Sequence, residues 1–141
     1  MEAQQPSLAV DCVVFDPLDR LLLIRRKNPP FQGQFAFPGG FVEYGETVEE
    51  AAFRTLEAET GIKSSVLHVA GVYSEANRDP RKHVITIAFL MLPDTTDPRA
   101  GPDAVTAEFV YDWRSAELAF DHSKILGDAC RLRELIQQGS V

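Results

Sequence analysis

A glycine-rich segment, Gly39 to Gly45, leads directly into a helix whose two ends are both marked in the sequence. Thr47 can cap the N-terminus with its hydroxyl, and Glu50, three residues later, can complete a capping box. Gly61 supplies the left-handed residue at which such a helix stops. We therefore expect a loop–helix–loop unit around which the rest of the chain must fold.

Runs of apolar and β-branched residues predict strands on both sides of this helix. Residues 8–15 and 20–24 are expected to pair as a hairpin, because Asp16-Pro17-Leu18-Asp19 between them is typical of a turn. Further strands are predicted at 34–37, 65–73, 83–92 and 107–113, and a second helix at 122–138, where apolar residues follow helical spacing. This order indicates one α/β domain over residues 1–141, with helices covering the faces of a mixed sheet.

Composition excludes some functions and sets a default location. A net charge of -7 argues against a nucleic-acid-binding surface, because non-specific nucleic-acid affinity comes from Lys and Arg. Residues 1–7 lack a basic-then-apolar signal, and no apolar run approaches the roughly 20 residues that span a bilayer. Without export signals, Cys12 and Cys130 are expected to be reduced thiols. We expect a cytoplasmic protein that binds neither nucleic acid nor membrane.

The segment from Gly40 to Ile62 resembles the Nudix box, the signature of hydrolases that cleave a pyrophosphate linked to another group. Seven of its positions are in register: Gly40, Glu46, Arg54, Leu56, Glu59, Gly61 and Ile62. Two are not, because Thr55 and Ala58 stand where the family has Glu. The resemblance implies a Nudix α/β/α sandwich and a Mg²⁺-dependent (or Mn²⁺-dependent) hydrolase, weakened by these two replacements.

The helix of the box normally presents three carboxylates, at i, i+3 and i+4, to the metal. The corresponding residues are Thr55, Ala58 and Glu59, of which only Glu59 carries a carboxylate. Glu57 cannot substitute, because it points about 160° away around the helix. The resemblance makes Glu59 a metal ligand, and the alternative is a structural Glu bonded to backbone or Arg. We expect the metal to bind weakly if at all, unless Glu75 or Glu108 fills in.

The glycine-rich segment supplies the other candidates implied by the resemblance. Glu43 is a candidate metal ligand or base, or only a hydrogen-bond acceptor within the loop. A backbone carbonyl here, assigned to Gly39, would touch the metal, and Gly39 and Gly40 are expected to allow close approach and positive φ. Glu46 and Arg54 would brace the loop against the helix. We also expect an i,i+4 pair between Glu50 and Arg54.

Outside the box, the stretch Arg78-Asp79-Pro80-Arg81 resembles a loop of Nudix ADP-ribose pyrophosphatases, and Phe120-Asp121-His122 fits the same group. Arg78 and Arg81 are candidates for binding phosphate, because guanidinium groups bind its oxygens through two hydrogen bonds. The alternative is that Arg78 and Asp79 pair with neighbours to shape the loop.

Three more interpretations concern further candidates for the site. Arg26 is a further phosphate candidate, with a surface role as the alternative, and Phe41 could stack on a base or belong to the core or rim. Asp121 is predicted to cap the last helix, with a general-base role for His122 as a lesser alternative.

Two hypotheses from different classes follow. The first is a hydrolase of a nucleoside diphosphate linked to another moiety, with ADP-ribose as the leading candidate. The second is a Nudix fold that has lost its metal ligands and binds a nucleotide or a protein partner. The family resemblance also makes a homodimer plausible, through the first hairpin or a sheet edge.

Overall fold

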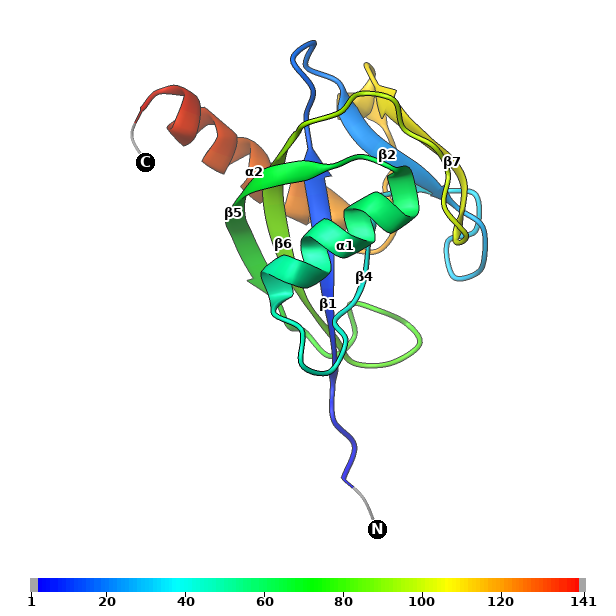
Figure 1. Ribbon diagram of the computed structural model, residues 1–141. Helices are drawn as coiled ribbons and strands as arrows, with labels where there is room; N and C mark the ends of the chain where they lie inside the picture. The colour runs from blue at the N-terminus through cyan, green and yellow to red at the C-terminus, as the bar shows by residue number, and fades with distance from the viewer. Residues whose placement is uncertain (1–2, 140–141) are drawn as a thin grey trace.

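The computed structural model describes residues 3–139, which form two sheets flanked by two helices (Figure 1). The larger sheet is mixed, because β1 runs parallel to β6 and antiparallel to β4. Its strands, in the order β4-β1-β6-β5, are Gly39–Phe41, Ser7–Val14, Val84–Pro93 and Ser64–Tyr73. The smaller sheet is antiparallel, and its strands, in the order β3-β2-β7, are Phe35–Ala36, Leu21–Arg26 and Ala104–Val110.

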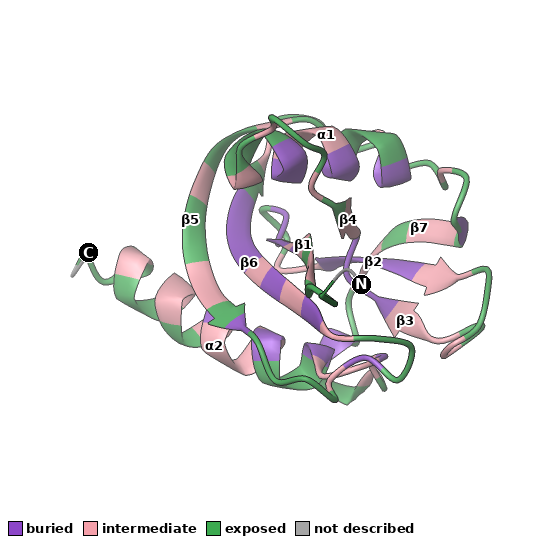
Figure 2. Ribbon diagram, turned by 90° about the horizontal axis from the view of Figure 1, so that it is seen from below, coloured by how far each residue is buried: buried purple, intermediate pink, exposed green. Residues whose placement is uncertain are grey.

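Helix α1 (Val48–Thr60) and helix α2 (His122–Gln137) cover opposite faces of the larger sheet. Figure 2 shows the buried side of α1 turned toward the strands and the long, largely buried strand β6 between the two helices. One core cluster joins α1 to β1 and β6, and a second joins α2 to the other face of the same strands. The predicted α/β class, with helices on both faces of a mixed sheet, is confirmed.

Strand β1 divides its side chains between the two faces by simple alternation. Val10, Cys12 and Val14 are buried in the cluster that contains α1, and Val13 packs in the cluster that contains α2. Asp11, with the same parity as Val13, therefore faces the α2 side, where its carboxylate meets the first residue of that helix.

The predicted hairpin between the first two strands is wrong. Only one isolated bridge, Phe15 to Leu21, connects them, and each strand then pairs within a different sheet. The buried Asp16 carboxylate accepts hydrogen bonds from the backbone N–H groups of Leu18 and Arg20 and from the Arg20 side chain. The predicted turn is thus present, but the two strands diverge immediately after it.

The predicted ends of α1 are confirmed. The Thr47 hydroxyl accepts from the Glu50 backbone, the Glu50 side chain accepts from the Thr47 backbone, and Gly61 ends the helix at φ 71°. The expected Glu50–Arg54 pair does not form, because the capping box occupies Glu50 and Arg54 turns toward the preceding loop. The last strand, β7, begins three residues earlier than predicted, and Trp113 lies in a short 3-10 helix, Trp113–Ser115.

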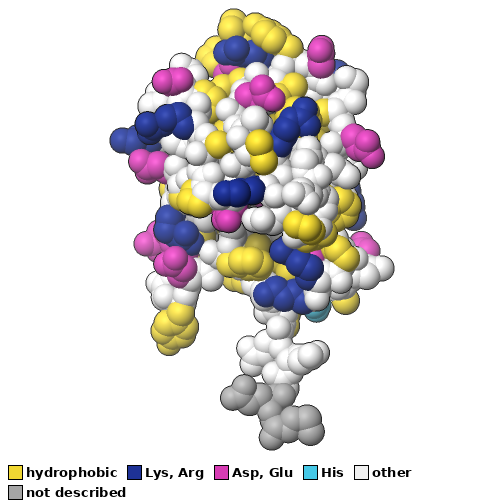
Figure 3. Space-filling view, turned by 90° about the vertical axis from the view of Figure 1, so that its right-hand side faces the viewer, with side chains coloured by type: hydrophobic (Ala, Val, Ile, Leu, Met, Phe, Trp, Pro, Cys, Tyr) yellow, Lys and Arg dark blue, Asp and Glu magenta, His cyan; other side chains and the backbone are white. Residues whose placement is uncertain are grey.

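Both cysteines are free thiols, as predicted, and they lie in different clusters of the core. Within residues 3–139, neither helix is long and apolar enough to cross a membrane. On the face shown in Figure 3, basic and acidic side chains are interspersed among apolar ones.

Candidate functional site

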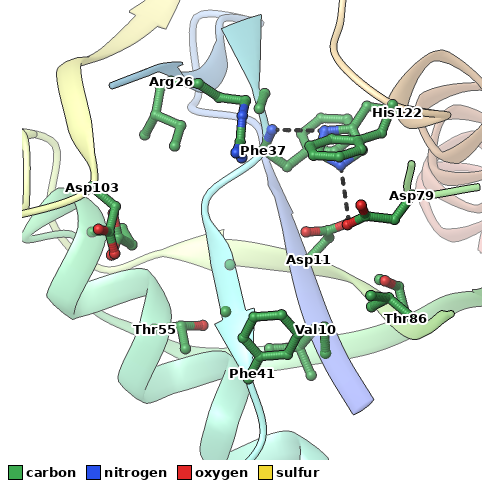
Figure 4. A pocket seen from close by; sticks show the side chains of 18 of the residues that line it. Val10, Asp11, Arg26, Phe37, Phe41, Thr55, Asp79, Thr86, Asp103 and His122 are labelled. Atoms are coloured by element: carbon green, nitrogen blue, oxygen red, sulfur yellow. Dashed lines mark hydrogen bonds and ion pairs between the residues drawn. The ribbon is translucent and has the colours of Figure 1, made fainter. Parts of the chain in front are cut away.

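A cleft of about 450 Å³ opens between the two sheets, beside the N-terminal half of β1 and the C-terminal half of α1 (Figure 4). Its walls come from strands β1, β2, β3, β4 and β6, helix α1, the loops after β2 and β5, the loop before β7 and the start of α2. Most of the residues singled out from the sequence line this cleft: Arg26, Gly39, Phe41, Arg54, Glu59, Arg78 and Arg81.

Glu59 is the buried carboxylate of the cleft. Its side chain accepts no hydrogen bond at Oε2, an atom shielded from solvent, and the residue is 9% exposed. Burial and the neighbouring carboxylate of Asp103 raise the pKa of Glu59 to about 7. A buried anion beside a second carboxylate, with one oxygen unpartnered, is unfavourable unless a cation joins them.

The loop before β7 delivers Asp103 to this position. The Gly101 N–H donates to the Glu59 carbonyl oxygen at 2.9 Å, and the Arg99 N–H donates to that of Thr60 at 2.7 Å. A Cβ on Gly101 would lie 2.2 Å from the Ala58 carbonyl oxygen, so only glycine allows this loop to sit so closely on the helix. Asp103 is a site residue that the sequence did not reveal.

Thr55 and Ala58 leave the adjoining helical positions without charge. The Thr55 side chain is buried, donates to the Ala52 carbonyl oxygen at 3.4 Å, and has its methyl group beside Gly40. Ala58 is exposed at the edge of the cleft. Glu75 and Glu108, the carboxylates considered as replacements, do not line the cleft. The prediction that one of them supplies a missing carboxylate is therefore not supported, and the carboxylate that lies beside Glu59 is that of Asp103.

Two carboxylates in the cleft are oxygen donors of the kind that Mg²⁺ uses. Within residues 3–139, no three His, Cys, Asp or Glu side chains lie close enough together to enclose a metal. Mg²⁺, however, is commonly held by one or two carboxylates and completes its shell with water and ligand phosphates. Glu59, with its unpartnered buried oxygen, and Asp103 beside it provide two such carboxylates.

Glu46 and Arg54 form the brace that the sequence indicated. Arg54 donates to both oxygens of Glu46, at 2.6 and 2.9 Å, and to the carbonyl oxygen of Phe41 at 2.9 Å. The Arg54 guanidinium and the Glu43 N–H together lower the pKa of Glu46 to about 2. Glu43 does not line the cleft; its side chain is 69% exposed and lies 3.7 Å from Arg54.

Gly39 and Gly40 differ in one respect from expectation. They belong to strand β4 and neither has a positive φ, which occurs instead at Gly45 (φ 84°). The expected close approach is present, because a Cβ on Gly39 would lie 2.1 Å from the Val10 carbonyl oxygen and 2.7 Å from Asp11 Oδ1. Glycine is needed here to let β4 pass the Asp11 carboxylate.

Arg78 is held by protein partners. Its guanidinium donates to both oxygens of Asp121, at 2.8 and 2.6 Å, and to the Thr86 hydroxyl at 2.7 Å. Its side chain is only 7% exposed. Asp121 stands at the N-cap position of α2 but makes no capping hydrogen bond, so its predicted role as a cap is wrong: its carboxylate is committed to Arg78.

The other cationic side chains are freer. Arg81 pairs with the buried Asp79 at 2.8 Å and is about half exposed. Arg26 lies over the Phe120 ring and donates to the Pro30 carbonyl oxygen at 2.7 Å. Phe41, 46% exposed, stands at the mouth of the cleft with the Lys82 ammonium 4.8 Å from its ring centroid.

Asp11 and His122 are the pair that the sequence analysis missed. Asp11 Oδ2 lies 3.2 Å from His122 Nε2, and both side chains are largely buried at the cleft wall (Figure 4). The signal was present, because Asp11 is the one charged residue in the otherwise apolar stretch from Leu8 to Phe15. Charged residues in buried strands are uncommon unless they are paired.

Comparisons with known proteins agree with this geometry. The model of the NUDIX domain matches residues 5–133. An ADP-ribose pyrophosphatase of Methanocaldococcus jannaschii is 49% identical over 126 residues, which cover 89% of this chain and 74% of that protein. An ADPR-responsive transcriptional repressor, NtrR, of Acinetobacter baylyi is 32% identical over 136 residues, and these cover 88% of this chain but only 53% of the repressor.

Solved structures give the same result. The NUDIX domain of Shewanella oneidensis NrtR, crystallised with ADP-ribose, superposes with a TM-score of 0.84 at 25% identity, covering 92% of this chain and 89% of that one. A MutT/nudix family protein of Enterococcus faecalis also has a TM-score of 0.84, at 28% identity, covering 97% of this chain and 64% of that one. The glycine-rich loop, the capped helix and the cleft beside Glu59 are thus the parts of a known fold, and this chain belongs to the Nudix family.

Proposed function

We propose that this chain is a metal-dependent hydrolase of a nucleoside diphosphate linked to another moiety, with ADP-ribose as the leading substrate. The observation that carries the proposal is the buried Glu59 carboxylate, which has an unpartnered oxygen and Asp103 as its neighbour. A purely structural Glu would be expected to have its oxygens hydrogen-bonded. The M. jannaschii relative, an ADP-ribose pyrophosphatase, supports the choice of substrate.

The residues of the cleft have distinct tasks in this proposal. Glu59 and Asp103 hold Mg²⁺ (or Mn²⁺), with the Gly39 carbonyl as a further oxygen, and the bound metal would neutralise phosphate charge and activate water. Arg81 and Arg26 bind the diphosphate, because both line the cleft and their guanidinium groups lie near the same Phe120 ring. The Glu46–Arg54 brace holds the glycine-rich loop at its edge.

Glu43, Arg78 and Phe41 have lesser roles. Glu43 adds negative charge near Arg54 but lies outside the cleft, which favours loop support over a role as ligand or base. Arg78 is saturated by Asp121 and Thr86, which favours shaping of the loop, with phosphate binding through Arg81. Phe41 is exposed enough at the mouth to stack on the nucleobase.

Turnover is proposed to be slow. Thr55 and Ala58 remove two full charges from the face of α1 that meets the metal, and changes even in the outer shell of metal sites commonly cost 10–100-fold. The Thr55 hydroxyl does not compensate, because it is buried and directed to the Ala52 carbonyl oxygen.

A second candidate function is a sensor that binds ADP-ribose without cleaving it. The same two replacements favour it, and one relative is a repressor described as responsive to ADPR. This chain spans about half of that repressor, so any regulatory partner is part of the proposal. Association of two copies is proposed to involve the exposed edge strand β5, where Val66, Val69 and Val72 face solvent.

Hydrolysis of ADP-ribose in the presence of Mg²⁺ or Mn²⁺, by wild type and Glu59→Gln, tests the proposal. Turnover that is lost in Glu59→Gln supports the hydrolase. Tight binding of ADP-ribose without turnover, unchanged by chelation of metal, supports the sensor and refutes the hydrolase.

A further inference from the structure

Asp11 is an acidic side chain in an unusual place, on a central strand of the larger sheet. It lies opposite Gly39 on β4 and beside Ala88 on β6, and it lines the cleft. The absence of a side chain at Gly39 makes room for its Oδ1 atom. The local packing is therefore built around a carboxylate at this point.

His122 fixes the orientation of that carboxylate. The Phe37 N–H donates to His122 Nδ1 at 3.1 Å, so the proton of the neutral imidazole is on Nε2, which donates to Asp11 Oδ2. The imidazole stacks on the Phe37 ring with centroids 5.0 Å apart. With one nitrogen accepting and the other protonated, His122 has no free lone pair for a general-base role.

Asp11 retains one oxygen for a ligand. In residues 3–139, the His122 ring is the only protein group within hydrogen-bonding or ion-pairing distance of its carboxylate, and the side chain is 14% exposed. Arg26 and Arg78 lie close enough to interact with its charge but do not bond to it. A fixed, cleft-facing carboxylate repels phosphate and accepts from hydroxyl groups.

We infer that Asp11, oriented by His122, forms a subsite for a ribose hydroxyl of the ligand, away from the phosphates. This inference rests on the proposed function, and it adds the direction in which the ligand lies in the cleft. The diphosphate lies toward Arg26, Arg81 and Glu59, and a sugar lies against β1. Either ribose of an ADP-ribose-like ligand carries the required hydroxyls. His122 is then a positioning residue that acts through Asp11.

Calorimetry with α,β-methylene ADP-ribose, which cannot be hydrolysed at the bridge, tests the subsite. Two further versions lack the 2′ and 3′ hydroxyls on the adenosine ribose or on the distal ribose. Asp11→Asn should bind the parent ligand at least about tenfold more weakly than wild type, because a hydrogen bond to a charged group is lost. Asp94→Asn, on an exposed loop outside the cleft, removes the same charge and should change nothing.

The deoxygenated ligands identify the sugar. One deoxygenated ligand should bind wild type and Asp11→Asn with equal affinity. That ligand lacks the hydroxyls that Asp11 binds. An affinity of Asp11→Asn for the parent within twofold of wild type, or an equal loss for all three ligands, would overturn the inference. If Asp11→Asn does not fold, the affinities of wild type for the three ligands test the inference. Equal affinities for all three would contradict a hydroxyl-binding subsite. Failure of wild type to bind any of them refutes the proposed function itself.

Discussion

Arg54 binds the Glu46 carboxylate through two hydrogen bonds of 2.6 and 2.9 Å, from Nε and Nη2. The same guanidinium reaches the Phe41 carbonyl oxygen, so one side chain ties α1 to both ends of the glycine-rich loop. Arg54→Lys keeps the charge but loses this planar geometry. We expect its affinity for ADP-ribose with Mg²⁺ to fall about 10–100-fold, with little change in melting temperature. Calorimetry measures this, with Arg114→Lys, exposed and outside the cleft, as control.

Glu59 should give the metal-free protein an unusual dependence of stability on pH. Its pKa is about 7 in the folded state against an ordinary value of 4.5, so the folded state binds more protons between these values. Its contribution to stability is therefore complete below pH 4.5 and is lost as pH rises through 7, on the order of 3 kcal/mol in all. Glu46, with a pKa of about 2 against an ordinary value of 4.5, contributes a slope of the opposite sign that fades just above pH 4.5 and is common to wild type and Glu59→Gln.

Urea unfolding in EDTA between pH 4.5 and pH 8 measures this effect. Wild type should lose free energy of unfolding across the range relative to Glu59→Gln, in which the titrating group is absent. Glu57→Gln, exposed on the same helix, should follow wild type. Parallel curves for wild type and Glu59→Gln would show that the Glu59 carboxylate is not perturbed.

Restoring one carboxylate should strengthen the metal site. Ala58 is exposed at the cleft, whereas Thr55 is buried against Gly40, so Ala58→Glu can be accommodated without repacking. We expect Ala58→Glu to bind Mn²⁺ at least about tenfold more tightly and to turn over ADP-ribose faster, because the added carboxylate can contact the metal directly. Electron paramagnetic resonance titration of Mn²⁺ measures the affinity. Gln138→Glu adds the same charge at the end of α2, and an equal gain there would contradict a local effect.

Substitution of Arg78 should mainly lower the stability of the fold, and substitution of Arg81 should mainly weaken ligand binding. Arg78→Ala leaves Asp121 without its bidentate partner in a largely buried pair, and we expect a loss of about 2–4 kcal/mol in the free energy of unfolding. Arg81→Lys keeps a positive charge beside the buried Asp79, so it should cost less than about 1 kcal/mol of stability, yet it loses the planar guanidinium and should weaken ADP-ribose binding more. Denaturant titration and calorimetry on both variants check the order, and the reverse order would mean that Arg78 is the phosphate ligand.

Local signals in the sequence were sufficient for the loop–helix–loop unit. Thr47, Glu50 and Gly61 act on backbone groups within a few residues of themselves, so their roles follow from spacing alone. The brace between Glu46 and Arg54 was likewise predicted. The competing Glu50–Arg54 pair does not form, because the capping box occupies Glu50.

Long-range pairings were not predictable in this way. Asp103 reaches Glu59 because Gly101 lets a distant loop sit on α1, and His122 reaches Asp11 across more than one hundred residues of chain. The position of Asp121 before a helix predicted a cap. Its carboxylate instead binds Arg78, which comes from another loop. The first two strands diverge for a similar reason, since their partners lie elsewhere in the sequence.

The most direct test of the account is hydrolysis of ADP-ribose with Mg²⁺ or Mn²⁺ by wild type, Glu59→Gln, Asp103→Asn and the repaired Ala58→Glu protein. The account predicts slow turnover by wild type, loss of that turnover in both Glu59→Gln and Asp103→Asn, and faster turnover in the repaired protein. A wild type that binds ADP-ribose but never cleaves it, beside a repaired protein that does, would contradict the hydrolase and identify the chain as a sensor with an intact Nudix cleft.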